Sequence, residues 1–304
     1  MRTIAIIMPY FGSWPAWKDL FFNSCASNSD VDFFFYTDCG TPDSVAPNMH
    51  FHDISFVDYC AKASSAIGVS FSPLTYRKLR DLRPFYGVIH YEEIKDYDFW
   101  GFGDVDLVFG NIRKFYNDDI LERFDILSAH VDRISGHFAV IRNNDHYRNL
   151  CFSMWNWRNE LQREGNSVLD ESEFSYQIHP SIRPFRILYA KMWKYFGWDF
   201  ASGVHYRVIP LLNRVARLES RRIRYKQMNI HPHWSGSDYW IYYPGSYQDK
   251  VRPRLMDVGN DEECIYCHFL PYKSRSSWRV NPCKERGIFV ASITPQGILP
   301  VVGE

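Results

Sequence analysis

The chain has 304 residues, of which 46% are hydrophobic and 17% are aromatic. This length and composition fit a globular protein with one large core and exclude an intrinsically disordered chain. Thirty-five basic residues balance 35 acidic ones, so the net charge indicates no particular charged partner.

Hydropathy and cysteine content bear on where the protein works. No window approaches the ~18 consecutive apolar residues of a membrane span, and the short apolar run before Pro9 predicts a first strand, not a signal peptide. Seven cysteines are scattered without the spacing of a disulfide framework. We therefore expect a soluble protein of the reducing cytoplasm, either free or held at the inner face of the cell membrane.

The first half of the chain has the pattern of a parallel sheet with covering helices. We expect, in chain order, a strand over 4–8, a helix over 14–25, a strand over 31–38, helices over 55–67, 72–83 and 85–94, and strands over 97–110, 124–129 and 137–141. Strand, helix and strand within 40 residues indicate a βαβ unit, and so an α/β fold.

The second half divides into three patterns. Asn143 or Asn144 caps a long amphipathic helix that runs to Leu161 and stops before Gly165. A basic segment follows, with 11 Lys or Arg against two acidic residues over 183–226, mostly helical in pattern. From Trp240 onward, turns between short apolar runs predict hairpins. We expect a core over 1–180, a basic aromatic helical segment over 181–235 and C-terminal hairpins over 236–304.

The basic segment interleaves its cations with aromatic residues such as Trp193 and Trp198. This composition suits the headgroup region of an anionic membrane, and a peripheral membrane contact is one interpretation. Nucleic acid is disfavoured, because no recognised binding module accompanies the basic residues. A solvated surface over ordinary core rings is the third interpretation.

Two aspartates, Asp104 and Asp106, interrupt an aromatic and branched stretch that otherwise predicts a buried strand. Buried carboxylates are tolerated only when they are paired or bind a metal. Residues i and i+2 of an extended segment share a side, and paired oxygens at a sheet edge suit Mg²⁺ or Mn²⁺. The alternative is that one aspartate caps a turn while the other pairs with an arginine.

Four stretches together carry a family resemblance. They are Tyr-Arg-Lys-Leu-Arg-Asp-Leu-Arg-Pro at 76–84, Tyr-Asp-Phe-Trp-Gly-Phe-Gly-Asp-Val-Asp at 97–106, Ser-Gly-His-Phe at 135–138 with Arg142-Asn143, and Cys-His-Phe-Leu-Pro-Tyr-Lys at 267–273. The set resembles the GT-A fold of nucleotide-sugar glycosyltransferases. It is nearer to a bacterial glycosyltransferase-like family found with polysaccharide genes and related to the glycogenin and lipopolysaccharide galactosyltransferase group. The resemblance implies a Rossmann-like, mixed and mostly parallel sheet flanked by helices, with a C-terminal helical and hairpin elaboration.

The same resemblance implies a metal site. Asp104 and Asp106 would hold Mn²⁺ or Mg²⁺ on the donor diphosphate, with His268 as a third ligand and Lys273 on the diphosphate. The spacing from His268 to Lys273 is one residue shorter than the common His-x-x-Gly-x-x-Lys, and its glycine is absent. A buried core histidine is the alternative for His268.

Further donor contacts are expected beyond the metal ligands. They are Pro9, Tyr10 and Asp38 after the first two strands, Lys78, Asp81 and Arg83 before the aspartate strand, and Asp104, His137 and Lys273. A plain salt bridge between Lys78 and Asp81, which are three residues apart, competes with the functional role. Asp38 as a simple loop residue and His137 as a structural histidine are equally open.

Asp170 and Glu171 are the expected catalytic carboxylates, because the resembling fold often places an acidic residue beside the reacting sugar carbon. A capping box between Asp170 and Glu173 is the competing account. Cys264 and Cys267 suggest zinc, with His268 and Cys283, but no second spaced pair completes such a site.

We therefore expect a metal-dependent hexosyltransferase that moves a sugar from a nucleotide-sugar, with UDP-sugar favoured, to a saccharide or lipid-linked saccharide. Retention of configuration and a role in bacterial surface polysaccharide synthesis, in capsule or lipopolysaccharide, are what the resemblance implies. One alternative is a sugar nucleotidyltransferase, although the loop at 8–15 lacks the basic residues that grip a triphosphate. The other is a non-catalytic saccharide-binding protein.

Overall fold

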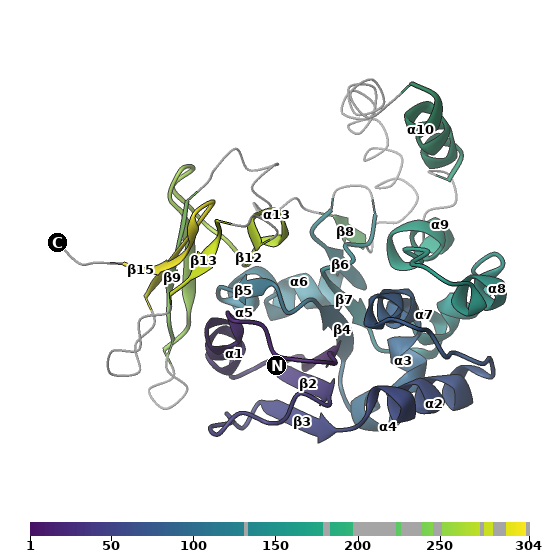
Figure 1. Ribbon diagram of the computed structural model, residues 1–304, viewed down its shortest axis with the longest axis horizontal. Helices are drawn as coiled ribbons and strands as arrows, with labels where there is room; N and C mark the ends of the chain where they lie inside the picture. Colours follow the sequence, from purple (N-terminus) through teal and green to yellow (C-terminus); the bar gives the residue numbers. More distant parts are fainter. Residues whose placement is uncertain are drawn as a thin grey trace.

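The fold is described from a computed structural model of the chain, for residues 1–130, 133–178, 183–196, 223–225, 239–245, 251–273, 277–281 and 290–301. Within these residues the secondary structure is mixed α/β, with a central sheet flanked by helices and a second sheet near the C-terminus (Figure 1). No helix in the described part of the chain is both long and apolar enough to cross a membrane.

Seven strands form the central sheet in the order β3-β2-β1-β4-β7-β6-β8. Their bounds are β1 (Ile4–Pro9), β2 (Asp32–Thr37), β3 (Met49–Asp53), β4 (Phe99–Gly103), β6 (Ile126–Ser128), β7 (Phe138–Arg142) and β8 (Ile223–Tyr225). Neighbouring pairs are parallel except at β7, which runs antiparallel to both β4 and β6. The expected mixed and mostly parallel sheet is therefore confirmed.

Helices surround this sheet. The α-helices are α1 (Lys18–Ala26), α2 (Phe56–Ile67), α3 (Tyr86–Ile89), α4 (Tyr91–Ile94), α5 (Ile112–Phe115), α6 (Asp118–Arg123), α7 (Asp145–Asn149), α8 (Trp157–Gln162), α9 (Ser175–Ile178), α10 (Arg183–Phe196) and α13 (Leu270–Lys273). The described part of the chain also has two 3₁₀ helices, η1 (Tyr76–Phe85) and η2 (Leu150–Ser153), and one π-helix, η3 (Asp170–Phe174).

Both faces of the sheet are buried, which explains why its strands are apolar at nearly every position. Ala5 and Ile7 of β1 pack on the side of α2, α3 and α8, while Ile4 and Ile6 pack on the side of α1 and α5. This division follows from the alternation of side chains along a strand. Figure 1 shows the two groups of helices on opposite faces of the sheet.

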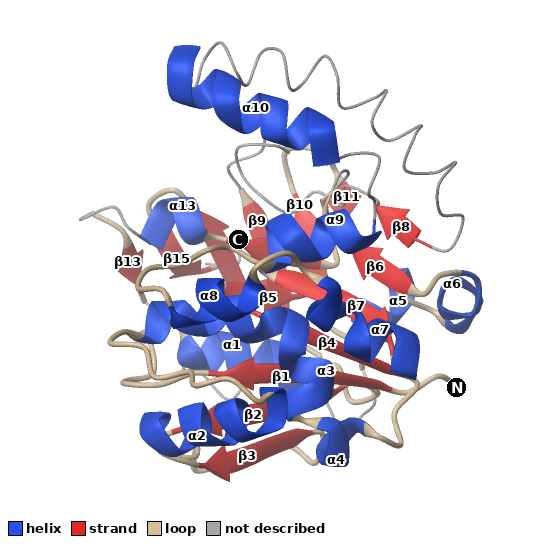
Figure 2. Cartoon of the chain, turned by 90° about the vertical axis from the view of Figure 1, so that its right-hand side faces the viewer, coloured by secondary structure: helices blue, strands red, loops and turns tan. Residues whose placement is uncertain are grey.

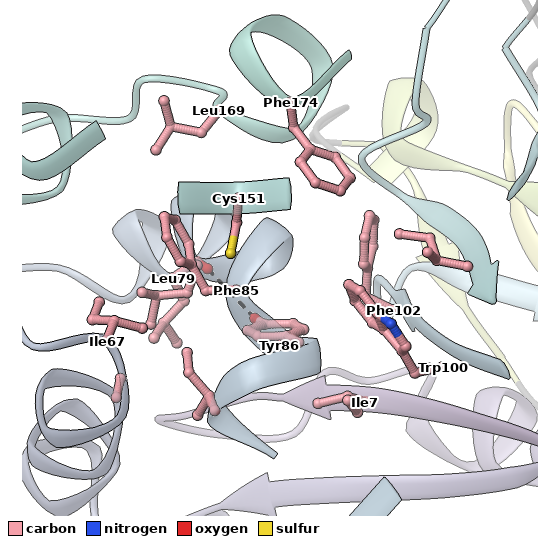
Figure 3. Packing of buried hydrophobic residues seen from close by; sticks show 14 of the residues in the cluster. Ile7, Ile67, Leu79, Phe85, Tyr86, Trp100, Phe102, Cys151, Leu169 and Phe174 are labelled. Carbon is pink, nitrogen blue, oxygen red and sulfur yellow. Dashed lines mark hydrogen bonds between the residues drawn. The ribbon is translucent and has the colours of Figure 1, made fainter. Parts of the chain in front are cut away.

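The packing on the first face joins the sheet to η1 and η3. Trp100 and Phe102 of β4 point toward Tyr86 of α3 and toward Phe174 of η3, as Figure 3 shows. The Tyr86 hydroxyl donates to the carbonyl of Leu79 at 3.4 Å. A continuous apolar layer therefore fixes η1 and η3 against the strand that precedes the two aspartates.

The C-terminal part forms its own sheet. It comprises β9 (Trp240–Tyr243), β10 (Arg254–Asp257), β11 (Glu262–Glu263), β13 (Arg279–Val280), β14 (Ala291–Thr294) and β15 (Gly297–Pro300). Strands β9 and β10 pair antiparallel, as do β14 and β15, which confirms the expected hairpin character of this part. A third apolar cluster, which includes Leu20, Val108 and Trp240, joins this sheet to α1 and to β5 (Leu107–Phe109).

The sequence predictions were wrong for several elements. The helix expected over 85–94 is divided into α3 and α4, and the strand expected over 97–110 is divided into β4 and β5. The segment expected as an α-helix over 72–83 is the 3₁₀ helix η1, and Pro84 lies inside it. The long helix expected to Leu161 is broken into α7, η2 and α8, because Met154 is extended and Asn156 has a left-handed φ of 56°. Strand β3 was not predicted, since it is only partly buried and carries His50 and His52.

The basic segment is described only in part. The helix α10 confirms helical structure over 183–196, and Figures 1 and 2 both show it away from the central sheet. Strand β8 adds a parallel edge to β6. The remaining residues on which the membrane interpretation depends, including Trp198, lie outside the described residues.

Candidate functional site

Asp104 and Asp106 lie in the short turn that joins β4 to β5. Asp104 is at the carboxyl end of β4, where its backbone N–H donates to the His137 carbonyl at 3.0 Å. Its side chain is 20% exposed, whereas that of Asp106 is 4% exposed. The Val105 carbonyl accepts from the Trp17 indole at 2.8 Å, which fixes the turn between the two carboxylates.

A pairing between distant parts of the chain brings His268 to this turn. Strand β12 (Tyr266–His268) runs antiparallel to β5, with His268 opposite Leu107. The Phe269 N–H also donates to the Asp106 carbonyl at 3.3 Å. As a result, His268 Nε2 lies 3.4 Å from Asp106 Oδ2.

The three side chains fit a divalent metal ion. One ligand atom each from Asp104, Asp106 and His268 can be chosen so that all three lie within 4.8 Å of one another. Two carboxylate oxygens and one imidazole nitrogen form a donor set that suits Mn²⁺, and also Mg²⁺ when water supplies further oxygens. The expected three residues are therefore brought together, and they could hold a metal.

Two cations face the same carboxylates. Lys273, at the end of α13, donates from Nζ to Asp106 Oδ2 at 2.5 Å. Arg83 pairs with Asp104 through Nη2 and with Asp170 through Nη1, the latter at 2.8 Å. The alternative of an arginine partner for one aspartate is thus also present in the structure.

The electrostatics of the cluster follow from burial and these pairs. Burial alone raises the pKa of Asp106, but the charges and hydrogen bonds of His268 and Lys273 outweigh it, so the pKa lies well below its usual range. Burial raises the pKa of Asp170 to about 6, although the charge of Arg83 opposes that shift. Asp106 is therefore ionised at neutral pH. Asp170, in contrast, titrates in the range just below neutral pH.

A cavity of about 190 Å³ opens beside these groups, between the turn after β1 and η1. Among the residues that line it are six that the sequence predicted, namely Pro9, Tyr10, Arg83, Asp104, Asp106 and Lys273. The Tyr10 ring stacks on Trp14, with centroids 5.1 Å apart and an angle of 6° between the planes. An aromatic platform, two carboxylates and the cations Arg83 and Lys273 thus converge on one cavity at the carboxyl edge of the sheet.

The model of a protein family matches residues 6–296, almost the whole chain, and is described as a family of unknown function, DUF6625. The chain belongs to this family. No curated protein matches it in sequence. The family description assigns no activity, so it leaves the chemistry of the site open.

Three solved structures share part of the fold at low sequence identity. Mouse xyloside xylosyltransferase 1 in its apo form is 11% identical, with a TM-score of 0.35, over 59% of this chain and 83% of that chain. A glycosyltransferase involved in the glycosylation of the major capsid of PBCV-1 is 12% identical, with a TM-score of 0.29, over 51% and 66%. The galactosyltransferase LgtC in complex with donor and acceptor sugar analogs is 12% identical, with a TM-score of 0.28, over 52% and 65%. TM-scores this low do not support the transfer of a function from these proteins, so the function has to be inferred from the geometry of this chain.

Three further predicted residues of this family member, His137, Glu171 and Asp38, are not among those that line the cavity. The ring of His137 stacks on that of His268, with centroids 4.3 Å apart. Ser135 Oγ lies 3.1 Å from both ring nitrogens of His137. Glu171 pairs with Arg133 at 3.0 Å. Asp38 accepts from the Gly12 N–H at 2.7 Å, so it holds the turn after β1.

Lys78 and Asp81 form the salt bridge that their spacing allowed. Their charged atoms are 2.8 Å apart, and the side chains are 2% and 0% exposed. Asp81 also accepts from the backbone N–H groups of Ser167 and Leu169. Neither residue is among those that line the cavity, so a donor contact from this pair stays a prediction from the resemblance.

Sequence reasoning missed two arginines. Arg77 and Arg80 both line the cavity and are exposed. They precede Arg83 by six and three residues, and a three-residue repeat matches the three residues per turn of a 3₁₀ helix. The three-residue repeat is present in the sequence. Its significance was missed because the segment was predicted to be an α-helix, in which these three side chains would not form one row.

Proposed function

We propose that the protein is a metal-dependent glycosyltransferase that moves a sugar from a nucleotide-sugar to a saccharide or lipid-linked saccharide acceptor. A UDP-sugar is the favoured donor, Mn²⁺ or Mg²⁺ the favoured cofactor, and retention of configuration the favoured outcome. The proposed setting is bacterial surface polysaccharide synthesis in the cytoplasm, at the inner face of the membrane. The resemblance of four sequence stretches suggests these details, and the geometry of the site supports the reaction class.

One observation carries the proposal. The ligand atoms of Asp104, Asp106 and His268 converge within 4.8 Å although the histidine lies more than 160 positions further along the chain. Burying ionised carboxylates costs several kcal/mol each unless they are compensated. Their placement beside a cavity rather than inside the core therefore favours a binding role over a purely structural one.

The proposed roles follow from charge and position. A bound divalent cation would screen the donor diphosphate and favour its departure. Lys273 and Arg83 supply positive charge at the same edge of the cavity, where negative charge develops on the leaving group. Tyr10 offers an aromatic face to a base.

The acidic pair at the start of η3 is proposed to act on the sugar and acceptor. Asp170 is connected to Asp104 through Arg83, and the Gly136 N–H donates to Glu171 Oε1 at 3.3 Å. A Cβ at position 136 would lie within 3 Å of carboxylate oxygens of both residues, so these side chains would have to shift to admit any residue other than glycine. The two carboxylates are therefore closely packed behind the cavity, where they can orient a hydroxyl or stabilise a sugar cation.

Calorimetry with UDP in the presence and absence of Mn²⁺ tests the proposal. We expect metal-dependent UDP binding that weakens at least about tenfold in Asp106→Asn, because one metal ligand is lost. The exposed Asp43→Asn variant is the control and should bind as the unchanged chain does. Equal affinities in all three proteins would overturn the metal-site argument. Tight binding of a nucleoside triphosphate would favour a nucleotidyltransferase, and saccharide binding without metal would favour a binding protein.

A further inference from the structure

The 3₁₀ helix η1 presents three arginines on one face. Since this helix has three residues per turn, side chains at i, i+3 and i+6 eclipse one another. Arg77, Arg80 and Arg83 obey this spacing, and all three line the cavity of the candidate site. At a rise of about 2.0 Å per residue, the row extends about 12 Å from the buried Arg83 to the exposed Arg77.

The other two faces of η1 explain why this row points into the cavity. Leu79, Leu82 and Phe85 form the apolar face and pack in the core, where Figure 3 shows two of them. Lys78 and Asp81 form the buried ion pair on the second face. The arginine row is the remaining face, so its direction is fixed by burial on both other sides.

The two outer arginines are not used by the inner site. Arg83 is paired with Asp104 and Asp170, and Lys273 is paired with Asp106. A divalent cation and the doubly charged diphosphate of a nucleotide-sugar bring charges of equal size and opposite sign, so their binding leaves Arg77 and Arg80 unneutralised. Among the residues that the structure describes, neither arginine makes an ion pair. Both are therefore available to a second anion.

An apolar groove of about 910 Å³ begins where the arginine row ends. It lies between the first turns of α2 and the segment 70–76, and Tyr76 lines both the groove and the cavity. Phe56, Phe71 and Leu74 contribute to its walls. Two aliphatic side chains at this groove are largely exposed, Val57 at 74% and Leu74 at 82%, so an apolar partner that covered them would bind with a favourable hydrophobic contribution.

We infer that this continuous surface binds an acceptor saccharide linked through phosphate to a hydrocarbon chain. The saccharide faces Asp104, the phosphate lies on Arg77 and Arg80, and the hydrocarbon lies in the groove beyond Tyr76. A guanidinium group can donate two parallel hydrogen bonds to two oxygens of one phosphate. A groove with exposed aliphatic walls suits an alkyl or isoprenyl chain. This inference rests on the proposed transferase function and selects the lipid-linked class among its acceptors.

Three probes separate the parts of this surface. Dodecyl phosphate carries both the anion and the chain, dodecyl maltoside carries the chain without the anion, and glucose 1-phosphate carries the anion without the chain. We expect dodecyl phosphate, below its micellar concentration, to bind the full chain at least about tenfold more tightly than either other probe, because only it satisfies both regions. Equal affinity for dodecyl phosphate and dodecyl maltoside would overturn the role of the arginines.

Matched variants test the residues. Arg77→Gln/Arg80→Gln and Val57→Asp/Leu74→Asp should each weaken dodecyl phosphate binding about tenfold or more, since each removes one region. Arg123→Gln/Arg158→Gln and Val45→Asp/Val258→Asp carry the same changes at exposed positions elsewhere and should leave binding unchanged. Weakening by the control pairs to the same extent would show non-specific adsorption and overturn the inference.

Mn²⁺-dependent UDP binding, measured in the same proteins, separates this inference from the proposed function. Retained UDP binding together with no dodecyl phosphate binding would overturn the acceptor site and leave the transferase proposal intact. Dodecyl phosphate binding that responds to the variants, without any UDP binding, would support the surface and count against the transferase. If the Arg77→Gln/Arg80→Gln and Val57→Asp/Leu74→Asp variants both retain UDP binding, the acceptor surface is separate from the donor site.

Discussion

At the scale of single residues, Arg83 is the centre of the candidate site. Its guanidinium is buried and lies between Asp104 and Asp170. Burial alone lowers the pKa of Arg83, but the two carboxylates raise it above its ordinary value, so the group stays charged. Asp170 depends on it in return, because the positive charge limits how far burial raises the pKa of that carboxyl. The charged form of each buried group is therefore stabilised by the charge of its partner.

Replacing Arg83 by methionine tests this dependence. Arg83→Met should lower the free energy of unfolding by about 3 kcal/mol at pH 8, because a buried carboxylate loses its compensating charge. The pKa of Asp170 is about 6 in the folded chain and about 3.9 when unfolded, so stability already falls as pH rises between these values. Without Arg83 the folded pKa rises further, and this fall extends above pH 6. Urea unfolding at pH 5 and pH 8 should therefore show the larger loss at pH 8.

The double variant Arg83→Met/Asp170→Asn is the internal control. It removes the carboxylate charge that Arg83 compensates, so it should recover much of the stability lost at pH 8. Arg123→Met, at an exposed position, should change stability by less than about 0.5 kcal/mol. A loss for Arg83→Met that is the same at both pH values would show that Asp170 does not respond to this charge.

At the scale of elements, η1 organises the site because its three faces have separate tasks. One face is in the core, one carries the arginine row, and the third carries Lys78 and Asp81. Asp81 accepts hydrogen bonds from Ser167 and Leu169, which lie directly before η3 and its Asp170. The Lys78–Asp81 pair thus connects η1 to the segment that positions the proposed catalytic carboxylates.

A second prediction concerns this pair. Lys78→Met should lower the free energy of unfolding by about 3 kcal/mol, because it leaves the fully buried Asp81 without its cation. Replacing both residues, as in Lys78→Met/Asp81→Leu, should cost less than the sum of the single changes, since no unpaired charge remains. Urea unfolding of the single and double variants measures both effects. If Lys78→Met instead weakened Mn²⁺-dependent UDP binding while stability was unchanged, Lys78 would act on the donor.

The same elements show how far the sequence alone could lead. Strands β1, β2 and β4 were predicted because both of their faces are buried and their sequences are continuously apolar. The 3₁₀ form of η1 could not be predicted from periodicity, because tertiary contacts of all three faces select it. The break at Asn156 was missed for a similar reason, since one left-handed residue is enough to divide an otherwise helical pattern.

The site itself was predictable only in part. The spacing of Asp104 and Asp106 indicated paired carboxylates, but it could not show which cations face them. His268 was assigned through a family resemblance, because no local pattern relates β12 to β5 across the intervening chain. Arg77 and Arg80 were missed, since their direction depends on the helix type rather than on their identity.

At the scale of the whole molecule, the candidate site joins the central sheet to the C-terminal part of the chain through the two-stranded sheet of β5 and β12. The central sheet supplies the two aspartates, and the C-terminal part supplies His268 and Lys273 through β12 and α13. Gly110 lies at a close approach between the two parts. A built Cβ at this position would be 2.4 Å from the Cys264 carbonyl oxygen and 3.0 Å from Leu255 Cβ.

Gly110→Ala should therefore disturb the contact between the two parts. We expect a loss of stability of about 1–3 kcal/mol, because backbone atoms must shift to admit the methyl group. Mn²⁺-dependent UDP binding should weaken as well, since β12 pairs with the strand that ends at Phe109. Thermal unfolding and calorimetry measure the two effects. An unchanged melting temperature would show that the contact adapts without cost.

Binding of metal and nucleotide should in turn hold the C-terminal part against the central sheet. With free ligand at 1,000 times its dissociation constant, the folded chain should gain about 4 kcal/mol, and chelation by EDTA should remove this gain. Amide hydrogen exchange should slow in β12 and α13, which carry His268 and Lys273, and change little in β3 at the far edge of the central sheet. In His268→Ala the protection of β12 should be lost first, because this residue is the ligand that the C-terminal part contributes. Protection that appeared only in the central sheet would show that the C-terminal part takes no share in holding the ligand.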